Sequence, residues 1–111
     1  MSDESNKYLT DILSSILSIE NYIGEKKDLN IYVANKMLRR AVERELEIIG
    51  EAVSKLKKID AEVQLTNSRK IIDLRNKVIH SYDSVDDIII WGIVIKYLPI
   101  LKTEIEVLLK F

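Results

Sequence analysis

Residues that interrupt helices are scarce in this chain, and this scarcity constrains its fold more than any other feature. The sequence has 111 residues, of which three are glycine and one is proline. Glycine and proline mark most turns, so a chain with so few of them has little room for many short strands. The length suits one hydrophobic core, so a single domain is expected over residues 1–111. The sequence therefore predicts an all-α domain built from a few long helices.

Apolar residues recur at steps of three and four along most of the chain, which is the spacing of one helix face. This pattern predicts four helices, at residues 7–22, 31–57, 67–81 and 85–109, with a short extra turn at residues 28–32 as a further option. Gly50 falls inside the second helix, where glycine costs about 1 kcal/mol relative to alanine. Its expected use is to let another helix approach closely. Glu45 falls on the apolar seam of the same helix, where a carboxylate must find a partner or open onto a cleft. The alternative is that Glu45 lies at the edge of the seam and reaches water.

The last predicted helix is apolar on almost every side between Ile88 and Leu101. Pro99 lies within it and predicts a kink, because proline cannot donate a backbone hydrogen bond. A helix of a small monomer needs only one buried stripe, so the second apolar face is expected to meet another subunit. The two-fold dimer is the commonest such assembly. The predicted architecture is an up-and-down bundle of four to five helices that forms a two-fold homodimer.

Composition excludes several classes of protein and site. The chain has no cysteine, so it has no disulfide, thiolate metal site or cysteine nucleophile. Its first residues are polar and acidic, unlike a secretory signal, and no apolar run reaches the roughly 18 residues of a membrane span. A cytoplasmic location is therefore expected. The net charge is −1, so any nucleic-acid contact must use a local basic patch, such as residues 36–44 or 69–77. The alternative is that these basic residues line solvated helix faces balanced by glutamates.

The segment RNKVIHSY, residues 75–82, gathers Arg75, Asn76, the only histidine (His80) and Tyr82. Histidine exchanges protons near neutral pH, and arginine can hold two phosphate oxygens at once. Together these groups suit RNA cleavage without a metal ion. Asn76 and His80 share a helix face, whereas Arg75 and His80 lie about 140° apart around the helix. The reach of arginine, a loosened last turn or a second copy of the segment must bring them together.

Acid–base cleavage needs two proton-handling groups, and a two-fold dimer would supply two copies of His80. The alternative is structural, because a histidine near a helix C-terminus often bonds the last carbonyl groups. No catalytic triad, metal site or cofactor site is predicted. Trp91 and the tyrosines other than Tyr82 are interpreted as core and interface residues. The spacing alone leaves the catalytic and the structural interpretation of His80 open.

Three stretches together indicate a family. Arg75, four residues, His80, one residue and Tyr82 match the pattern RX4HXY. The stretches ELEIIGEA, residues 45–52, and DDIIIWGIVIKYLPILKTEIEVLL, residues 86–109, lie on either side of it in the expected order. With these stretches the chain resembles the HepT-like proteins of the HEPN superfamily, over residues 7–109. The motif alone is moderately specific, whereas the three stretches together are quite specific.

The resemblance implies a helical-bundle dimer that is the toxin of a type VII-like toxin–antitoxin pair. It implies metal-independent RNA cleavage with Arg75 and His80 as catalytic residues and Asn76 as a supporting polar residue, acting on tRNA or mRNA. It also implies a partner, an MntA-like minimal nucleotidyltransferase, that neutralises the toxin by AMPylation of Tyr82. Glu45 and Glu51 match acidic positions of the family without an assigned role. The alternative function is a non-catalytic helical binding subunit of such a nucleotidyltransferase.

Overall fold

Helices account for all the regular structure in the part of the chain that the computed structural model describes, residues 2–80 and 87–110. For residues 77–80 only the backbone is described. The prediction of an all-α fold is therefore confirmed. The helices are α1 (Asp3–Ile23), α2 (Leu29–Ala34), α3 (Lys36–Ile59), α4 (Ser68–His80), α5 (Asp87–Lys96) and α6 (Leu98–Leu108).

Two predicted helices are interrupted. The segment predicted as one helix over residues 31–57 breaks at Asn35, whose side chain accepts a hydrogen bond from the Leu38 amide at 3.0 Å and caps α3. The preceding residues form the separate helix α2. The last predicted helix breaks at Tyr97, and Pro99 lies in the first turn of α6, where its missing N–H leaves no bond unmade. The kink predicted from Pro99 is thus a change from one helix to the next.

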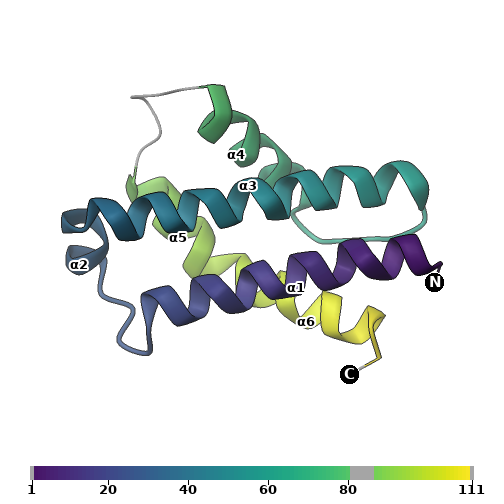
Figure 1. Cartoon of the computed structure of the whole chain (residues 1–111), viewed down its shortest axis with the longest axis horizontal. Helices are drawn as coiled ribbons and strands as arrows, with labels where there is room; N and C mark the ends of the chain where they lie inside the picture. The colour runs from purple at the N-terminus through teal and green to yellow at the C-terminus, as the bar shows by residue number, and fades with distance from the viewer. Residues whose placement is uncertain (1, 81–86, 111) are drawn as a thin grey trace.

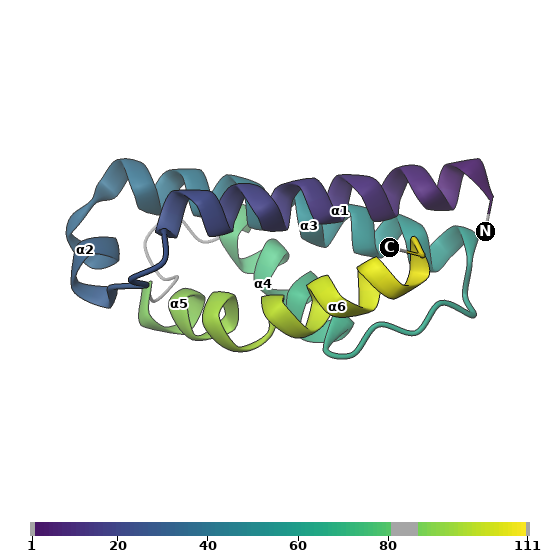
Figure 2. The same ribbon diagram turned by 90° about the horizontal axis from the view of Figure 1, so that it is seen from below.

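The long helices α1 and α3 run antiparallel, side by side, and form one layer of the molecule (Figure 1). The second layer holds α5 and α6, seen edge-on in Figure 2, and α6 packs on α1. The motif helix α4 packs on α3, and α2 contacts both α3 and α5. This arrangement matches the predicted up-and-down bundle, and it places the motif helix against the middle of α3.

Aliphatic side chains from α1, α3, α4, α5 and α6 form most of the buried core, and Tyr32 adds an aromatic ring from α2. Glu45 does not enter this core: it is half-exposed, and the Tyr22 hydroxyl donates a hydrogen bond to it at 3.2 Å. It therefore lies at the edge of the seam and also has a partner. No helix in residues 2–80 and 87–110 is long and apolar enough to cross a membrane. The fully buried side chains include Leu9, Ile12, Ile16, Leu46, Ile49, Leu56, Ile71, Ile90, Leu101 and Ile105.

Candidate functional site

Gly50 brings the motif helix into direct contact with α3. A β-carbon added at Gly50 would lie 2.3 Å from Cβ and 2.8 Å from Cγ of Arg75. Real β-carbons do not approach other atoms so closely, so only glycine fits here without a shift of one helix. The prediction that Gly50 admits a second helix is confirmed. That helix is α4, and the side chain above Gly50 is the motif arginine.

Arg75 differs from the other four arginines of the chain in its charge partners. The others each pair with a carboxylate: Arg39 with Asp87 at 3.4 Å, Arg40 with Glu43 at 3.5 Å, Arg44 with Glu47 at 3.1 Å and Arg69 with Asp73 at 3.8 Å. Within the described part of the chain, Arg75 makes no ion pair. Its Nη1 donates to Asn76 Oδ1 at 3.0 Å, a neutral acceptor. Its charge is therefore not neutralised by any described side chain.

A carboxylate does lie in the neighbourhood of Arg75, but it is bonded elsewhere. Glu51 follows Gly50 on α3 and accepts a hydrogen bond from Lys55, with Nζ and Oε1 3.0 Å apart. This bond holds the pKa of Glu51 below its usual range, and the Arg75 charge adds to the effect. The same bond raises the pKa of Lys55. Lys55 thus binds a carboxylate whose charge also interacts with that of Arg75.

The motif segment is described only in part. Arg75 and Asn76 lie together at the middle of α4, with Asn76 exposed and Arg75 half-buried. The backbone is helical to His80, but the His80 side chain lies outside what the structure describes, as do Tyr82 and the rest of residues 81–86. The structure therefore brings Arg75 and Asn76 together, and the approach of His80 to Arg75 stays a prediction.

The first described residue after the motif segment contacts α3. Asp87, in the first turn of α5, pairs with Arg39 near the start of α3. Arg39 and Gly50 are about 16 Å apart along that helix, at a rise of about 1.5 Å per residue. The Arg75 contact at Gly50 and the Asp87 contact at Arg39 therefore mark the two ends of a stretch of α3. Glu43 lies in this stretch, and its partial burial, together with nearby acidic groups, raises the pKa of its carboxyl.

A buried tyrosine, Tyr32 on α2, packs near the N-terminal end of α3. The Tyr32 side chain is fully buried, and its ring lies 5.2 Å from that of Trp91. Its hydroxyl has no hydrogen-bond partner among the described residues. Burial, with a smaller contribution from Asp87, raises the pKa of this hydroxyl far above its usual range. The two aromatic rings therefore join α2 to α5 through an apolar contact, as expected for core residues.

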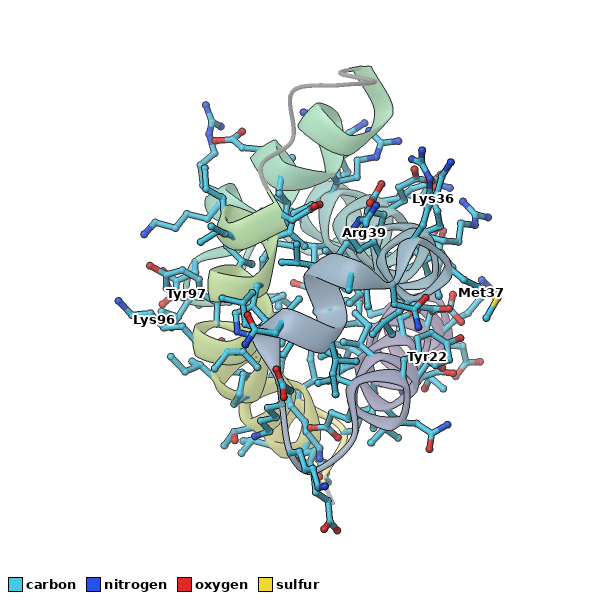
Figure 3. All side chains as sticks on the ribbon, turned by 90° about the vertical axis from the view of Figure 1, so that its left-hand side faces the viewer. Tyr22, Lys36, Met37, Arg39, Lys96 and Tyr97 are labelled. Carbon is cyan, nitrogen blue, oxygen red and sulfur yellow. The ribbon has the colours of Figure 1, made fainter. Side chains whose placement is uncertain are left out.

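Apart from Arg75, two lysines that lie around Tyr97 also have no carboxylate partner among the described residues. Lys70 Nζ donates to the Tyr97 hydroxyl at 2.7 Å and lies 4.6 Å from the ring centroid, and Lys96 Nζ lies 5.5 Å from the same centroid. The hydrogen bond from Lys70 lowers the pKa of Tyr97. Neither lysine has a carboxylate partner in the described part of the chain. Lys96 and Tyr97 lie on the opposite side of the molecule from Tyr22 and Met37 (Figure 3). Tyr97 is half-exposed and bound by Lys70, so it does not belong to the buried core, and its expected place at a subunit interface stays a prediction.

Residues 12–108 match the protein family described as "Ribonuclease HepT-like". This stretch covers most of the chain. The chain belongs to the HepT-like ribonuclease family. The resemblance inferred from the motif and its two flanking stretches is therefore confirmed.

Several similar proteins align with this chain over nearly its whole length. "Putative RNase MJ1380" of Methanocaldococcus jannaschii is 38% identical over 102 residues, which is 90% of this chain and 92% of the relative. "Putative RNase MJ0125" of the same organism is 35% identical over 104 residues, 93% and 89% of the two chains. "Probable ribonuclease HepT" of Thermococcus cleftensis is 35% identical over 107 residues, 93% and 94% of the two chains. No solved structure gives a significant match.

Some features of this HepT-like site carried no signal in the sequence. Gly50 stood out, but its contact with Arg75 joins residues far apart in the chain. Lys55 and Glu51 are four residues apart, an ordinary helix pair, and nothing in that spacing indicates the neighbouring arginine. No cluster of three or more histidine, cysteine, aspartate or glutamate side chains able to hold a metal ion occurs among the described residues.

Proposed function

We propose that this protein is the ribonuclease toxin of a toxin–antitoxin pair and cleaves RNA without a metal ion, using Arg75 and His80. The proposal includes a cytoplasmic location, where its RNA substrate is found. Family membership supports ribonuclease activity. The relatives named as ribonucleases, which extend over almost the same length, point the same way.

The observation that carries the proposal is the free charge of Arg75. The other four arginines pair with carboxylates, whereas Arg75 makes no ion pair with any described residue. A guanidinium held in place without a carboxylate suits a phosphate group, whose oxygens it can bind in a bidentate manner. A purely structural arginine on a helix surface would be expected to pair as its four counterparts do.

The proposed reaction transfers a phosphoryl group within the RNA backbone. One His80 side chain, as general base, removes the proton from a ribose 2′-hydroxyl. The 2′-oxygen forms a bond to the adjacent phosphorus, and the bond from phosphorus to the 5′-oxygen breaks. A second His80 side chain, protonated and contributed by the other protomer, gives its proton to the departing 5′-oxygen. Arg75 binds the non-bridging oxygens and stabilises the extra negative charge of the transition state.

A homodimer supplies the two histidines in this scheme. Exposed apolar side chains on the last two helices support such an assembly: Ile89 on α5 is 56% exposed and Ile100 on α6 is 43% exposed. Ile89→Glu should give a monomer with little cleavage activity, as measured by light scattering and RNA assay. Val107→Glu, at the far end of α6 and 69% exposed, is the matched control and should remain dimeric. A monomeric wild-type protein that cleaves RNA would contradict the shared site.

The proposed antitoxin is an MntA-like minimal nucleotidyltransferase that AMPylates Tyr82. AMP attached two residues after His80 would add bulk and negative charge where the RNA phosphate must bind. Occlusion and repulsion between like charges would then block cleavage. Co-expression with such an enzyme should add the mass of AMP groups to the wild-type protein and none to Tyr82→Phe.

The direct test uses purified protein and RNA. Wild-type protein should degrade RNA, and Arg75→Ala and His80→Ala should each lose cleavage while they retain the helical circular dichroism spectrum. Arg69→Ala, which removes an arginine from the same helix that pairs with Asp73, should cleave normally. Equal cleavage by wild type and His80→Ala would refute the role of His80. Absence of any cleavage, with a stable nucleotidyltransferase complex, would favour the non-catalytic binding subunit instead.

A further inference from the structure

We propose that Gly50 is a positioning residue for Arg75, because its missing side chain allows α3 to fix the direction of the guanidinium. The inference rests on the proposed ribonuclease function, in which that guanidinium binds the scissile phosphate. Gly50 would act through Arg75 and would not contact RNA.

Two contacts one turn apart fix α4 on Gly50. A β-carbon at this position would meet the Arg75 side chain at 2.3 and 2.8 Å and the Ile71 carbonyl oxygen at 3.3 Å. Ile71 and Arg75 are four residues apart and therefore lie on one face of α4. The Ile71 side chain is itself buried, which resists rotation of the helix. The first two carbons of the Arg75 side chain are therefore held against the backbone of α3.

The buried part of Arg75 extends beyond these carbons. Its Nε is buried and has no acceptor among the described residues, whereas Nη1 reaches the exposed Asn76. The Nε–H group thus faces the protein interior, and the Nη groups at the outer edge of the guanidinium are the donors that a phosphate can reach. A side chain held in one orientation loses less entropy when it binds phosphate, and a displacement of about 1 Å can cost about 100-fold in rate.

The other helical glycine provides a matched control. Gly92 lies within α5, and a β-carbon there would meet nothing within 4 Å. Gly50→Ala and Gly92→Ala therefore add the same methyl group to a helix interior, with and without contact with Arg75. If glycine served only helix flexibility, the two variants would behave alike.

The first experiment compares RNA cleavage and the Arg75 side chain in these variants. Gly92→Ala should cleave like the wild type. Gly50→Ala should keep its helical spectrum, lose cleavage by about 100-fold, and show faster hydrogen exchange at Arg75 Nε by nuclear magnetic resonance. Wild-type cleavage together with unchanged exchange in Gly50→Ala would overturn the proposal. If the wild type cleaves no RNA, the proposed function fails, and the exchange measurement still tests the position of Arg75.

Thermal unfolding of single and double variants separates an effect through Arg75 from a general packing defect. This measurement does not depend on cleavage activity, so it remains informative if Gly50→Ala is destabilised. Arg75→Gly removes both carbons that an alanine at position 50 would meet. Gly50→Ala should lower the midpoint of thermal unfolding in the wild-type background. In the Arg75→Gly background it should leave the midpoint unchanged or raise it, because the helix preference of alanine over glycine is no longer opposed by the Arg75 carbons. An equal decrease in both backgrounds would show that position 50 acts on the fold without Arg75, and would refute the positioning role.

Discussion

Replacement of Tyr32 by phenylalanine should stabilise this protein, an unusual outcome for a fully buried residue. The Tyr32 hydroxyl has no hydrogen-bond partner among the described residues. A buried polar group without a partner costs about 1–3 kcal/mol. Phenylalanine keeps the ring that packs 5.2 Å from Trp91 and removes that cost. We expect a gain of about 1–2 kcal/mol, which for a chain of this length raises the midpoint of thermal unfolding by roughly 4–8 °C.

The pH dependence gives the same prediction a second test. Burial raises the pKa of the Tyr32 hydroxyl in the folded state, so folding favours its neutral form. In the unfolded chain tyrosine ionises near pH 10. Above about pH 10 the hydroxyl ionises more readily in the unfolded chain than in the folded protein, so the wild type loses stability as the pH rises further, whereas below pH 10 it loses none. The advantage of Tyr32→Phe over wild type should thus grow above pH 10.

Urea unfolding followed by circular dichroism measures both effects. Tyr22→Phe is the matched control, because the Tyr22 hydroxyl donates to Glu45 at 3.2 Å and its removal should be neutral or slightly destabilising. Destabilisation by Tyr32→Phe would mean that the hydroxyl is hydrogen-bonded in the folded protein. That result would refute the description of the contact between α2 and α5 as purely apolar.

Two further predictions concern charges near the motif. Lys55→Ala should lower RNA cleavage about threefold, because Glu51 would then be free to pair with Arg75. The double variant Lys55→Ala, Glu51→Gln should regain the wild-type rate. An unchanged rate in Lys55→Ala would contradict this prediction. Lys70→Ala should weaken RNA binding and reduce the salt dependence of log K by about 0.7, as expected for one lost phosphate contact to a single strand. Lys7→Ala, which removes a lysine that also lies over a tyrosine ring but pairs with a carboxylate, should bind RNA normally in the same titration.

Helix content and the buried faces could be predicted from the sequence because the apolar spacing is a local property of each segment. The break at Asn35 was missed, because the apolar pattern continues on both sides of it and a single polar residue caps the new helix. The break at Tyr97 was anticipated only as a kink. Proline excludes a backbone hydrogen bond, but it does not determine whether the chain bends or starts a new helix.

The candidate site was only partly predictable, for a physical reason. Arg75 and Asn76 were identified by residue type and motif spacing, and Gly50 by its unfavourable position inside a helix. Their contact could not be derived, because it depends on how α4 packs on α3. The lack of an ion pair between Arg75 and any described residue is likewise a tertiary property, since Glu51 lies 24 positions away in sequence and pairs with Lys55.

The central claim is that Arg75 assists an attack by the ribose 2′-hydroxyl that needs no metal ion. The most direct measurement is the end-group analysis of RNA fragments produced by the purified protein in excess chelator. Wild-type protein should yield 2′,3′-cyclic phosphate and 5′-hydroxyl ends, and Arg75→Ala should yield almost none. Loss of cleavage on addition of the chelator, products with 5′-phosphate ends, or undiminished cleavage by Arg75→Ala would each contradict the mechanism.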